Sequence, residues 1–161
     1  MKNCDNMSVG VIIQSPEGEF ALLKRARFPI GIAPPAGHID EHGQPEQAAV
    51  TEVQEELGLV LAINGLRNTV IQDRRVNNQC RRPSGDHHKW WVYESNDYSG
   101  KLAPDVDETQ GAGWYNPDQL QALADRTKAF QARQLSQDEW EVSPGLEEVW
   151  LDFLTELGYV H

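Results

Sequence analysis

The sequence predicts an α+β protein in which strands and helices alternate within a single domain, residues 1–161. Two apolar, partly β-branched runs separated by turn residues lie within the first 25 residues. A helix follows between Pro45 and Gly58, because proline suits the first turn of a helix and glycine suits the left-handed residue just after its end. The second half adds further strand-like runs and then two helical segments with large apolar residues.

Length and composition restrict the class of protein. The 161 residues are enough for one ordinary domain with its own core. No secretory or membrane-spanning segment is found, so we expect a cytoplasmic protein. A net charge of −11 argues against a general nucleic-acid binder, since such proteins cluster Lys and Arg. Cys4 and Cys80 are too few and too far apart in sequence to predict a metal motif or a disulfide framework, and we expect free thiols.

The N-terminal region is expected to form a β-hairpin. Residues 8–14 and 19–25 are the strand-like runs, and Ser15-Pro-Glu-Gly18 between them is rich in turn-forming residues. The second run ends at Arg25. Residues 28–36 then form a Pro- and Gly-rich approach to the helix.

Two more strands, at about residues 67–76 and 88–94, are expected to flank a polar loop. Trp90 and Trp91 fall on opposite faces of the second of these strands. At least one Trp should pack in the core, while Trp91 is a candidate for stacking on a nucleobase.

A local excess of positive charge accompanies this loop. Only two acids, Asp73 and Asp86, lie in residues 67–89, against six bases: Arg67, Arg74, Arg75, Arg81, Arg82 and Lys89. Such a patch in an acidic protein suits a small anionic ligand, and a solvated loop with scattered charge is the alternative. The candidate ligand-binding residues are Arg74, Arg75, Arg81 and Arg82.

The C-terminal region begins with an acidic, Gly-rich loop, residues 104–113, which leads to a short strand at Trp114 and Tyr115. Asn116-Pro-Asp118 should start one helix, and Ser143-Pro144 should cap a final one. The final helix supplies large apolar residues for the core or for a dimer surface: Leu146, Val149, Trp150, Phe153, Leu154 and Leu157.

The predicted central helix concentrates carboxylates on one face. At about 100° per residue, Glu52, Glu55 and Glu56 fall within one arc. A solvated helix usually intersperses Lys or Arg among such acids, but none occurs between Arg27 and Arg67. We therefore favour a divalent cation as the counter-ion, since Mg²⁺ and Mn²⁺ prefer oxygen ligands.

The segment from Gly37 to Leu59 resembles the box of the Nudix hydrolases, G-x5-E-x7-R-E-U-x-E-E-x-G-U, where U is a bulky aliphatic residue. Seven of its nine fixed positions agree: Gly37, Glu52, Val53, Glu55, Glu56, Gly58 and Leu59. Gly43 stands where the family has Glu, and Thr51 stands where it has Arg. Both members of that supporting pair are absent together, so neither leaves an unpaired charge.

The resemblance implies the Nudix fold, an α/β/α sandwich with a mixed β-sheet. It also implies hydrolysis of a nucleoside diphosphate linked to another group, with Mg²⁺ or Mn²⁺ held by Glu52, Glu55 and Glu56. Gly37 would shape the loop and contact substrate. Many Nudix proteins also end their second strand in Arg, so Arg25 resembles a phosphate ligand, and an ordinary surface side chain is the alternative. Glu108 lies six residues before Trp114, where some family members place a further metal ligand or base. The sequence leaves the base open between Glu52 and Glu108.

Two other functions remain open on the same fold. A nucleotide-binding module without catalysis is compatible with the departures at Gly43 and Thr51, although the intact glutamate triad disfavours it. A metal-dependent isomerase is the third reading. The resemblance also allows a homodimer, while the identity of the nucleotide-type substrate is not encoded in any signal that we find.

Overall fold

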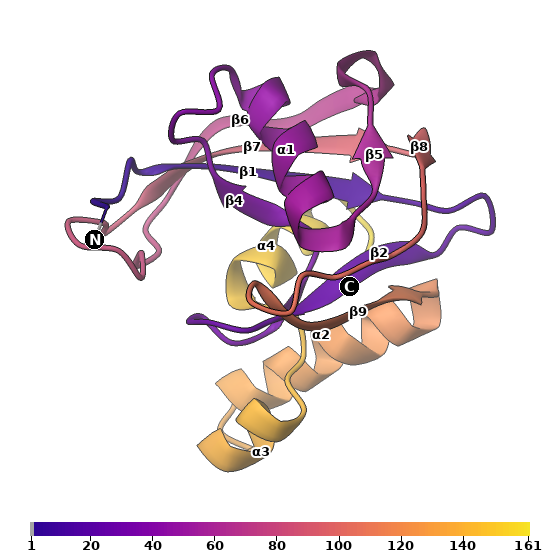
Figure 1. Cartoon of the computed structure of the whole chain (residues 1–161). Coiled ribbons are helices and arrows are strands. Elements are labelled where there is room, and N and C mark those ends of the chain that lie inside the picture. The colour runs from indigo at the N-terminus through magenta and orange to yellow at the C-terminus, as the bar shows by residue number, and fades with distance from the viewer. Residues whose placement is uncertain (1) are drawn as a thin grey trace.

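The computed structural model describes residues 2–161 (Figure 1). The strands within this range are β1 (Met7–Ile13), β2 (Phe20–Arg25), β3 (Ile32–Ala33), β4 (Ala36–His38), β5 (Val60–Leu61), β6 (Asn68–Val76), β7 (His88–Ser95), β8 (Tyr98–Ser99) and β9 (Thr109–Tyr115). The helices are α1 (Pro45–Leu57), the short 3₁₀ helix η1 (Ile63–Gly65), α2 (Pro117–Gln131), α3 (Gln137–Val142) and α4 (Glu148–Glu156). None of these helices is long and apolar enough to cross a membrane.

The strands form two main sheets and one short pair. The larger sheet has the order β4-β1-β7-β6, in which β1 runs parallel to β7 and the other neighbours are antiparallel. The second sheet, β3-β2-β9, is antiparallel throughout, and β5 pairs with β8. Mixed strand directions together with the helices confirm the predicted α+β class with a mixed sheet.

The expected N-terminal hairpin forms only at its turn, and beyond the turn the prediction is wrong. The Ser15 N–H donates to the Glu19 carbonyl at 2.8 Å, and Gln14 makes a single bridge with Phe20. The two strands then separate, β1 pairing with β4 and β7 while β2 pairs with β3 and β9. The turn-forming residues predict the turn correctly, because a turn depends on neighbouring residues. The pairing of the two strands depends instead on strands that are distant in sequence.

The larger sheet lies between two hydrophobic clusters because alternate residues of β1 point to opposite faces. Val9, Val11 and Ile13 pack with α1 on one face, while Ile12 packs with α4 on the other. This arrangement gives the helix–sheet–helix layering of the α/β/α sandwich, with α1 and α4 visible on either side of β1 and β4 (Figure 1).

The C-terminal helices are partly as predicted. Asn116 caps α2, accepting from the Gln119 N–H at 2.8 Å. Ser143 instead ends α3, and the last helix begins only at Glu148, so the predicted cap at Ser143-Pro144 is wrong. The expected apolar residues of the last segment are core residues: Leu146, Val149, Trp150, Phe153 and Leu154 are all buried.

Candidate active site

The site is built on α1, whose two ends are those that the sequence predicts. Pro45 occupies the first turn, and the Gln47 side chain accepts from the Gln44 N–H at 3.3 Å. At the other end Gly58 has φ of 71° and donates its N–H to the Gln54 carbonyl at 2.9 Å. A left-handed residue at this point ends the helix with one more carbonyl satisfied.

The two departures from the Nudix box have a local explanation. Gly43 has φ of +89°, a conformation that side-chain-bearing residues rarely adopt, and a Cβ there would lie 2.4 Å from Gln47 Oε1. Thr51 donates its hydroxyl to the Gln47 carbonyl at 2.9 Å. Neutral contacts around Gln47 therefore occupy the loop–helix junction where the family pattern has a Glu and an Arg.

The three glutamates of α1 differ sharply in burial. Glu56 is buried, and its Oε1 accepts the Ala36 N–H at 2.7 Å, which fixes the carboxylate against β4. Glu52 lies over Gly37, since a Cβ on that residue would come within 2.2 Å of the Glu52 carboxyl carbon. Glu55 is exposed at the cavity mouth. The glycine at position 37 is thus required by the close approach of Glu52.

The electrostatics of the buried pair favour a cation. Burial, and then repulsion from Glu55 and Glu108, raises the pKa of Glu52 from 4.5 to about 8. Burial, and then repulsion from Glu52, likewise raises the pKa of Glu56 to about 8, although the Ala36 N–H and Arg25 act in the opposite direction. Two carboxylates in such an environment ionise readily only when a positive charge joins them.

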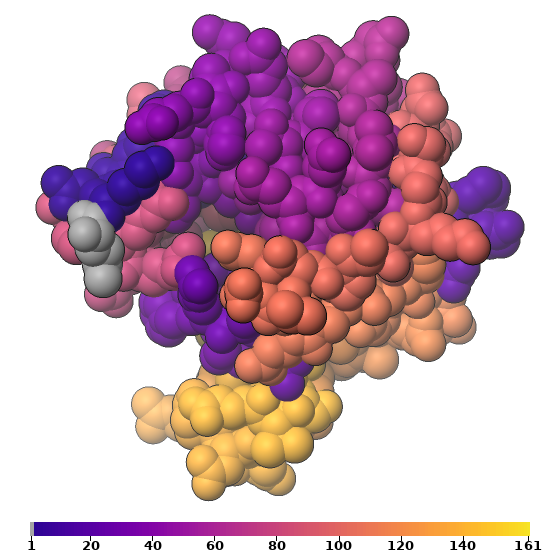
Figure 2. Space-filling view, viewed as in Figure 1, coloured from indigo at the N-terminus to yellow at the C-terminus, as the bar shows by residue number. Residues whose placement is uncertain are grey.

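These glutamates line a cavity of about 230 Å³. In Figure 2 it appears as a hollow between the pink loop before β7, the violet segment after β2 and the orange segment before β9. The predicted residues that line this cavity are Arg25, Gly37, Glu52, Glu55, Glu56, Arg81, Arg82 and Glu108. Eight candidates from five separate segments of the sequence therefore meet at one place.

Three candidates do not reach the cavity, so the predicted basic patch does not form one continuous surface there. Arg74 pairs with Glu156 at 2.8 Å, and Arg75 donates to Asn77 Oδ1 at 3.2 Å. Trp91 packs against the cluster beneath α1, on the opposite face of β7 from Trp90. It is the buried Trp90 that borders the cavity.

Comparison with models of protein families shows to which family the chain belongs. The model of the NUDIX domain matches residues 5–138, which run from just before β1 through α2 to the start of α3. This chain belongs to the Nudix family. No curated protein sequence matches it significantly.

Solved structures of Nudix proteins resemble it in fold. A MutT NUDIX hydrolase from Burkholderia pseudomallei is 26% identical, with a TM-score of 0.55 over 71% of this chain and 84% of the other. A MutT protein from Methanosarcina mazei Go1 reaches a TM-score of 0.64 at 15% identity, over 98% and 96%. A NUDIX hydrolase from Nitrosomonas europaea reaches 0.54 at 17% identity, over 98% and 91%. The last two show the fold alone.

Family membership confirms that the protein is an enzyme of the pyrophosphohydrolase class. Nudix hydrolases generally require a divalent metal, and the donor set of this Nudix chain fits one. Glu52, Glu55 and Glu56 supply carboxylate oxygens, the ligands that Mg²⁺ and Mn²⁺ prefer. Burial raises the pKa of both Glu52 and Glu56, so their ionised forms gain from a bound cation.

Three further residues that line the cavity, His42, Asp40 and Glu147, were not singled out from the sequence. His42 lies with Glu52 and Glu55 in a group whose potential metal-ligating atoms are all within 4.8 Å of one another, and its Nε2 is 3.8 Å from Glu52. Asp40 holds Arg82 at 2.8 Å. Glu147 is buried at the cavity wall, and burial raises its pKa. His42 falls inside the box, so its spacing from Gly37 was the one available signal.

Proposed function

We propose that this Nudix enzyme hydrolyses the diphosphate bond of a nucleoside diphosphate linked to another moiety, through attack of water on phosphorus. One observation carries the proposal. Six carboxyl groups and four arginines line a single cavity, so groups suited to a cation lie beside groups suited to phosphates. Mg²⁺ or Mn²⁺ at the carboxylates would polarise the bridge and lower the pKa of bound water.

The residues of the chain divide this work. We assign Glu52, Glu55 and Glu56 to holding the metal, with Glu56 kept in place by the Ala36 N–H. Arg25, Arg81 and Arg82 bind phosphate oxygens, because guanidinium groups offer paired donors of fixed geometry. Arg82 is itself oriented by Asp40.

The proton of the attacking water goes to one of two carboxylates. Glu52 is partly enclosed and adjoins Gly37, whereas Glu108 is exposed in the segment before β9, where the Asp105 side chain accepts its backbone N–H at 3.1 Å. Both line the cavity, and both are candidates for metal ligation. Kinetics of the Glu52→Gln and Glu108→Gln variants distinguish the two candidates for the base.

The proposed domain is the whole chain, residues 1–161. Although the family match ends at residue 138, Trp150 of α4 lies in the same core cluster as Ile12 and Trp90. The last helix therefore completes the layer opposite α1.

The direct test is a panel of nucleoside diphosphate derivatives assayed for turnover with Mg²⁺ and with Mn²⁺. Turnover of at least one member by the wild-type protein, lost in Glu56→Gln and retained in the exposed control Glu17→Gln, supports the proposal. Saturable binding of these compounds without turnover by either metal would instead establish a binding module. Conversion of the compounds without release of a phosphorylated product would establish an isomerase.

A further inference from the structure

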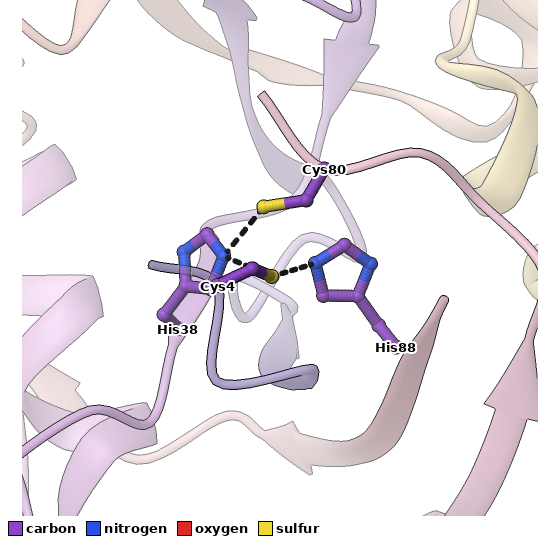
Figure 3. A group of neighbouring side chains, drawn as sticks. All are labelled: Cys4, His38, Cys80 and His88. Carbon is purple, nitrogen blue, oxygen red and sulfur yellow. Dashed lines mark hydrogen bonds between the residues drawn. The ribbon is translucent and has the colours of Figure 1, made fainter. Parts of the chain in front are cut away.

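A second group of metal-ligating side chains lies at the wall of the carboxylate cavity, which His38, Cys80 and His88 also line. Its members come from four separate segments: Cys4 precedes β1, His38 ends β4, Cys80 lies in the loop before β7, and His88 begins β7 (Figure 3). Each offers one ligand atom, and these four atoms all lie within 4.8 Å of one another. The separation of the two cysteines in sequence therefore does not keep them apart in the folded protein, and the expectation that they cannot share a metal site is wrong. Both are free thiols, as expected.

The separations within this Cys₂His₂ cluster match those of a tetrahedral site. Cys4 Sγ is 3.5 Å from His38 Nε2 and 3.3 Å from His88 Nε2, and Cys80 Sγ is 3.2 Å from His38 Nε2. A tetrahedral Zn²⁺, about 2.3 Å from sulfur and about 2.0–2.1 Å from nitrogen, places such atoms about 3.5 Å apart.

The surroundings orient the ligands as metal sites usually do. His88 Nδ1 faces Asn78 Oδ1 at 3.1 Å, which places a proton on Nδ1 and leaves the lone pair of Nε2 directed at the sulfur of Cys4. The Arg82 N–H donates to Cys80 Sγ at 3.4 Å, a contact that stabilises a thiolate. A Cβ on Gly85 would lie 2.2 Å from the Cβ of Cys80 and 2.7 Å from that of Cys4, so the loop backbone closes over both cysteines.

The loop between β6 and β7 has little apolar packing, and its polar ties are the Arg82–Asp40 ion pair at 2.8 Å and the Cys4 N–H that donates to the Pro83 carbonyl at 2.9 Å. Cys80 is the one buried residue in the range 77–87. Hydrophobic packing therefore cannot fix a segment that places Arg81 and Arg82 at the cavity. Bonds from one metal ion to Cys80 and to ligands on three other segments would hold the loop in place of apolar packing.

We propose that Cys4, His38, Cys80 and His88 bind one structural Zn²⁺, which fastens the 77–87 loop to the N-terminal segment, β4 and β7. Four protein ligands leave no open position, as in structural rather than catalytic zinc sites. Two sulfurs and two imidazoles select zinc, whereas the oxygen-rich glutamate site selects Mg²⁺ or Mn²⁺, so the two neighbouring sites take different metals.

Protonation follows from this assignment. Burial lowers the pKa of His38 to about 4 and also lowers that of His88, so both imidazoles are neutral and able to ligate at neutral pH. Burial raises the pKa of Cys4 to about 11, which keeps the metal-free thiol protonated. Binding of Zn²⁺ to the Cys4 thiol then releases its proton to solvent.

Zinc content of the purified, reduced protein tests the proposal without reference to activity. We expect about one Zn²⁺ per chain after dialysis against a weak chelator, and almost none in Cys4→Ser or Cys80→Ser. His87→Gln, next to the ligand but outside the cluster, is the matched control and should keep its zinc. Asn78→Ala should weaken zinc binding by about 10–100-fold, measured by competition with a chromophoric chelator.

Measurements on the unaltered chain keep the test decisive if a variant fails to fold. Co²⁺ should give thiolate-to-metal charge-transfer bands and the visible spectrum of a tetrahedral ion, and Glu56→Gln should retain both. Removal of zinc should expose both thiols to alkylation and speed tryptic cleavage after Arg81. Folded, reduced protein that takes up no zinc, zinc retained in both serine variants, or Co²⁺ without a thiolate band would each overturn the proposal.

Discussion

At the scale of single residues, the site depends on how unequally three neighbouring glutamates are buried. Glu56 is fixed to the Ala36 backbone, Glu52 lies over Gly37, and Glu55 faces solvent. One helix thus presents carboxylates at three depths, from the core edge to the cavity mouth. Buried carboxylates with raised pKa values are frequent at functional sites, and here they lie in the cavity itself.

Glu108 and Glu52 should be distinguishable by kinetics. Loss of a general base costs about 10²–10⁴ in rate. If Glu108 is the base, Glu108→Gln should lower kcat by that factor while Glu52→Gln lowers it less, and the reverse result assigns Glu52. Single-turnover rates at saturating metal measure the chemical step. A Glu108→Gln enzyme with unaltered kcat and unaltered Mg²⁺ dependence would remove Glu108 from the site.

Gly37 provides a second test at this scale, because its role depends on space rather than charge. A Cβ there would overlap the Glu52 carboxylate, so Gly37→Ala should displace Glu52 and lower kcat while the protein remains folded. Thermal unfolding together with kcat measures both effects. Gly113→Ala on β9, where a Cβ would meet only the Tyr115 side chain at 3.7 Å, controls for the general cost of alanine in place of glycine. Equal kcat values in the two variants would contradict the steric role of Gly37.

At the scale of elements, the 77–87 loop decides which arginines belong to the site. Arg81 and Arg82 at the loop border the cavity, whereas Arg74 on β6 is engaged by Glu156 of α4. All four arginines of the predicted patch are near in sequence, but β6 carries two of them away from the glutamates.

Arg81→Ala should therefore raise KM more than it lowers kcat, since a phosphate contact made equally in the ground and transition states contributes to binding alone. Arg74→Ala is the matched control and should leave both constants near their wild-type values. Steady-state kinetics on a substrate found with the panel measures the difference. Equal changes in KM and kcat in the two variants would show that Arg81 does not bind substrate and that the loop is simply solvated.

At the scale of the whole molecule, the buried carboxylates link stability to pH. The pKa of Glu52 and of Glu56 in the folded protein is about 8, above the usual 4.5, so the folded state binds these protons more tightly than the unfolded chain does. Their contribution is fully present below pH 4.5 and is lost as the pH rises through about 8.

In the protein freed of divalent metal from the carboxylate site, Glu56→Gln should therefore gain free energy of unfolding relative to wild type as the pH rises from 4.5 toward 8. Comparing variant with wild type removes the opposite trend from the buried imidazoles of His38 and His88. Denaturant unfolding at several pH values measures the difference in free energy of unfolding between variant and wild type, with Glu17→Gln as control. Saturating Mg²⁺ should remove the advantage of the variant, and a difference that does not change with pH would refute the linkage.

The sequence by itself determined the features that depend on neighbouring residues. Pro45 and Gly58 set the ends of α1, and the spacing of Glu52, Glu55 and Glu56 set their common face, because helix geometry is fixed by local backbone and capping preferences. The same box predicted the family that the domain match confirms. Eight of the predicted site residues line one cavity, as their proposed roles require.

Only the tertiary structure decided which distant segments meet. The first two strands join different sheets, Arg74 and Arg75 point away from the cavity, and Trp90 rather than Trp91 borders it. Cys4 and Cys80 are 76 positions apart in the chain, yet the pairing of β1 with β4 and β7 brings them together with two histidines. No periodicity or spacing encodes such a meeting, because it depends on strand pairing and packing between segments that share no local signal.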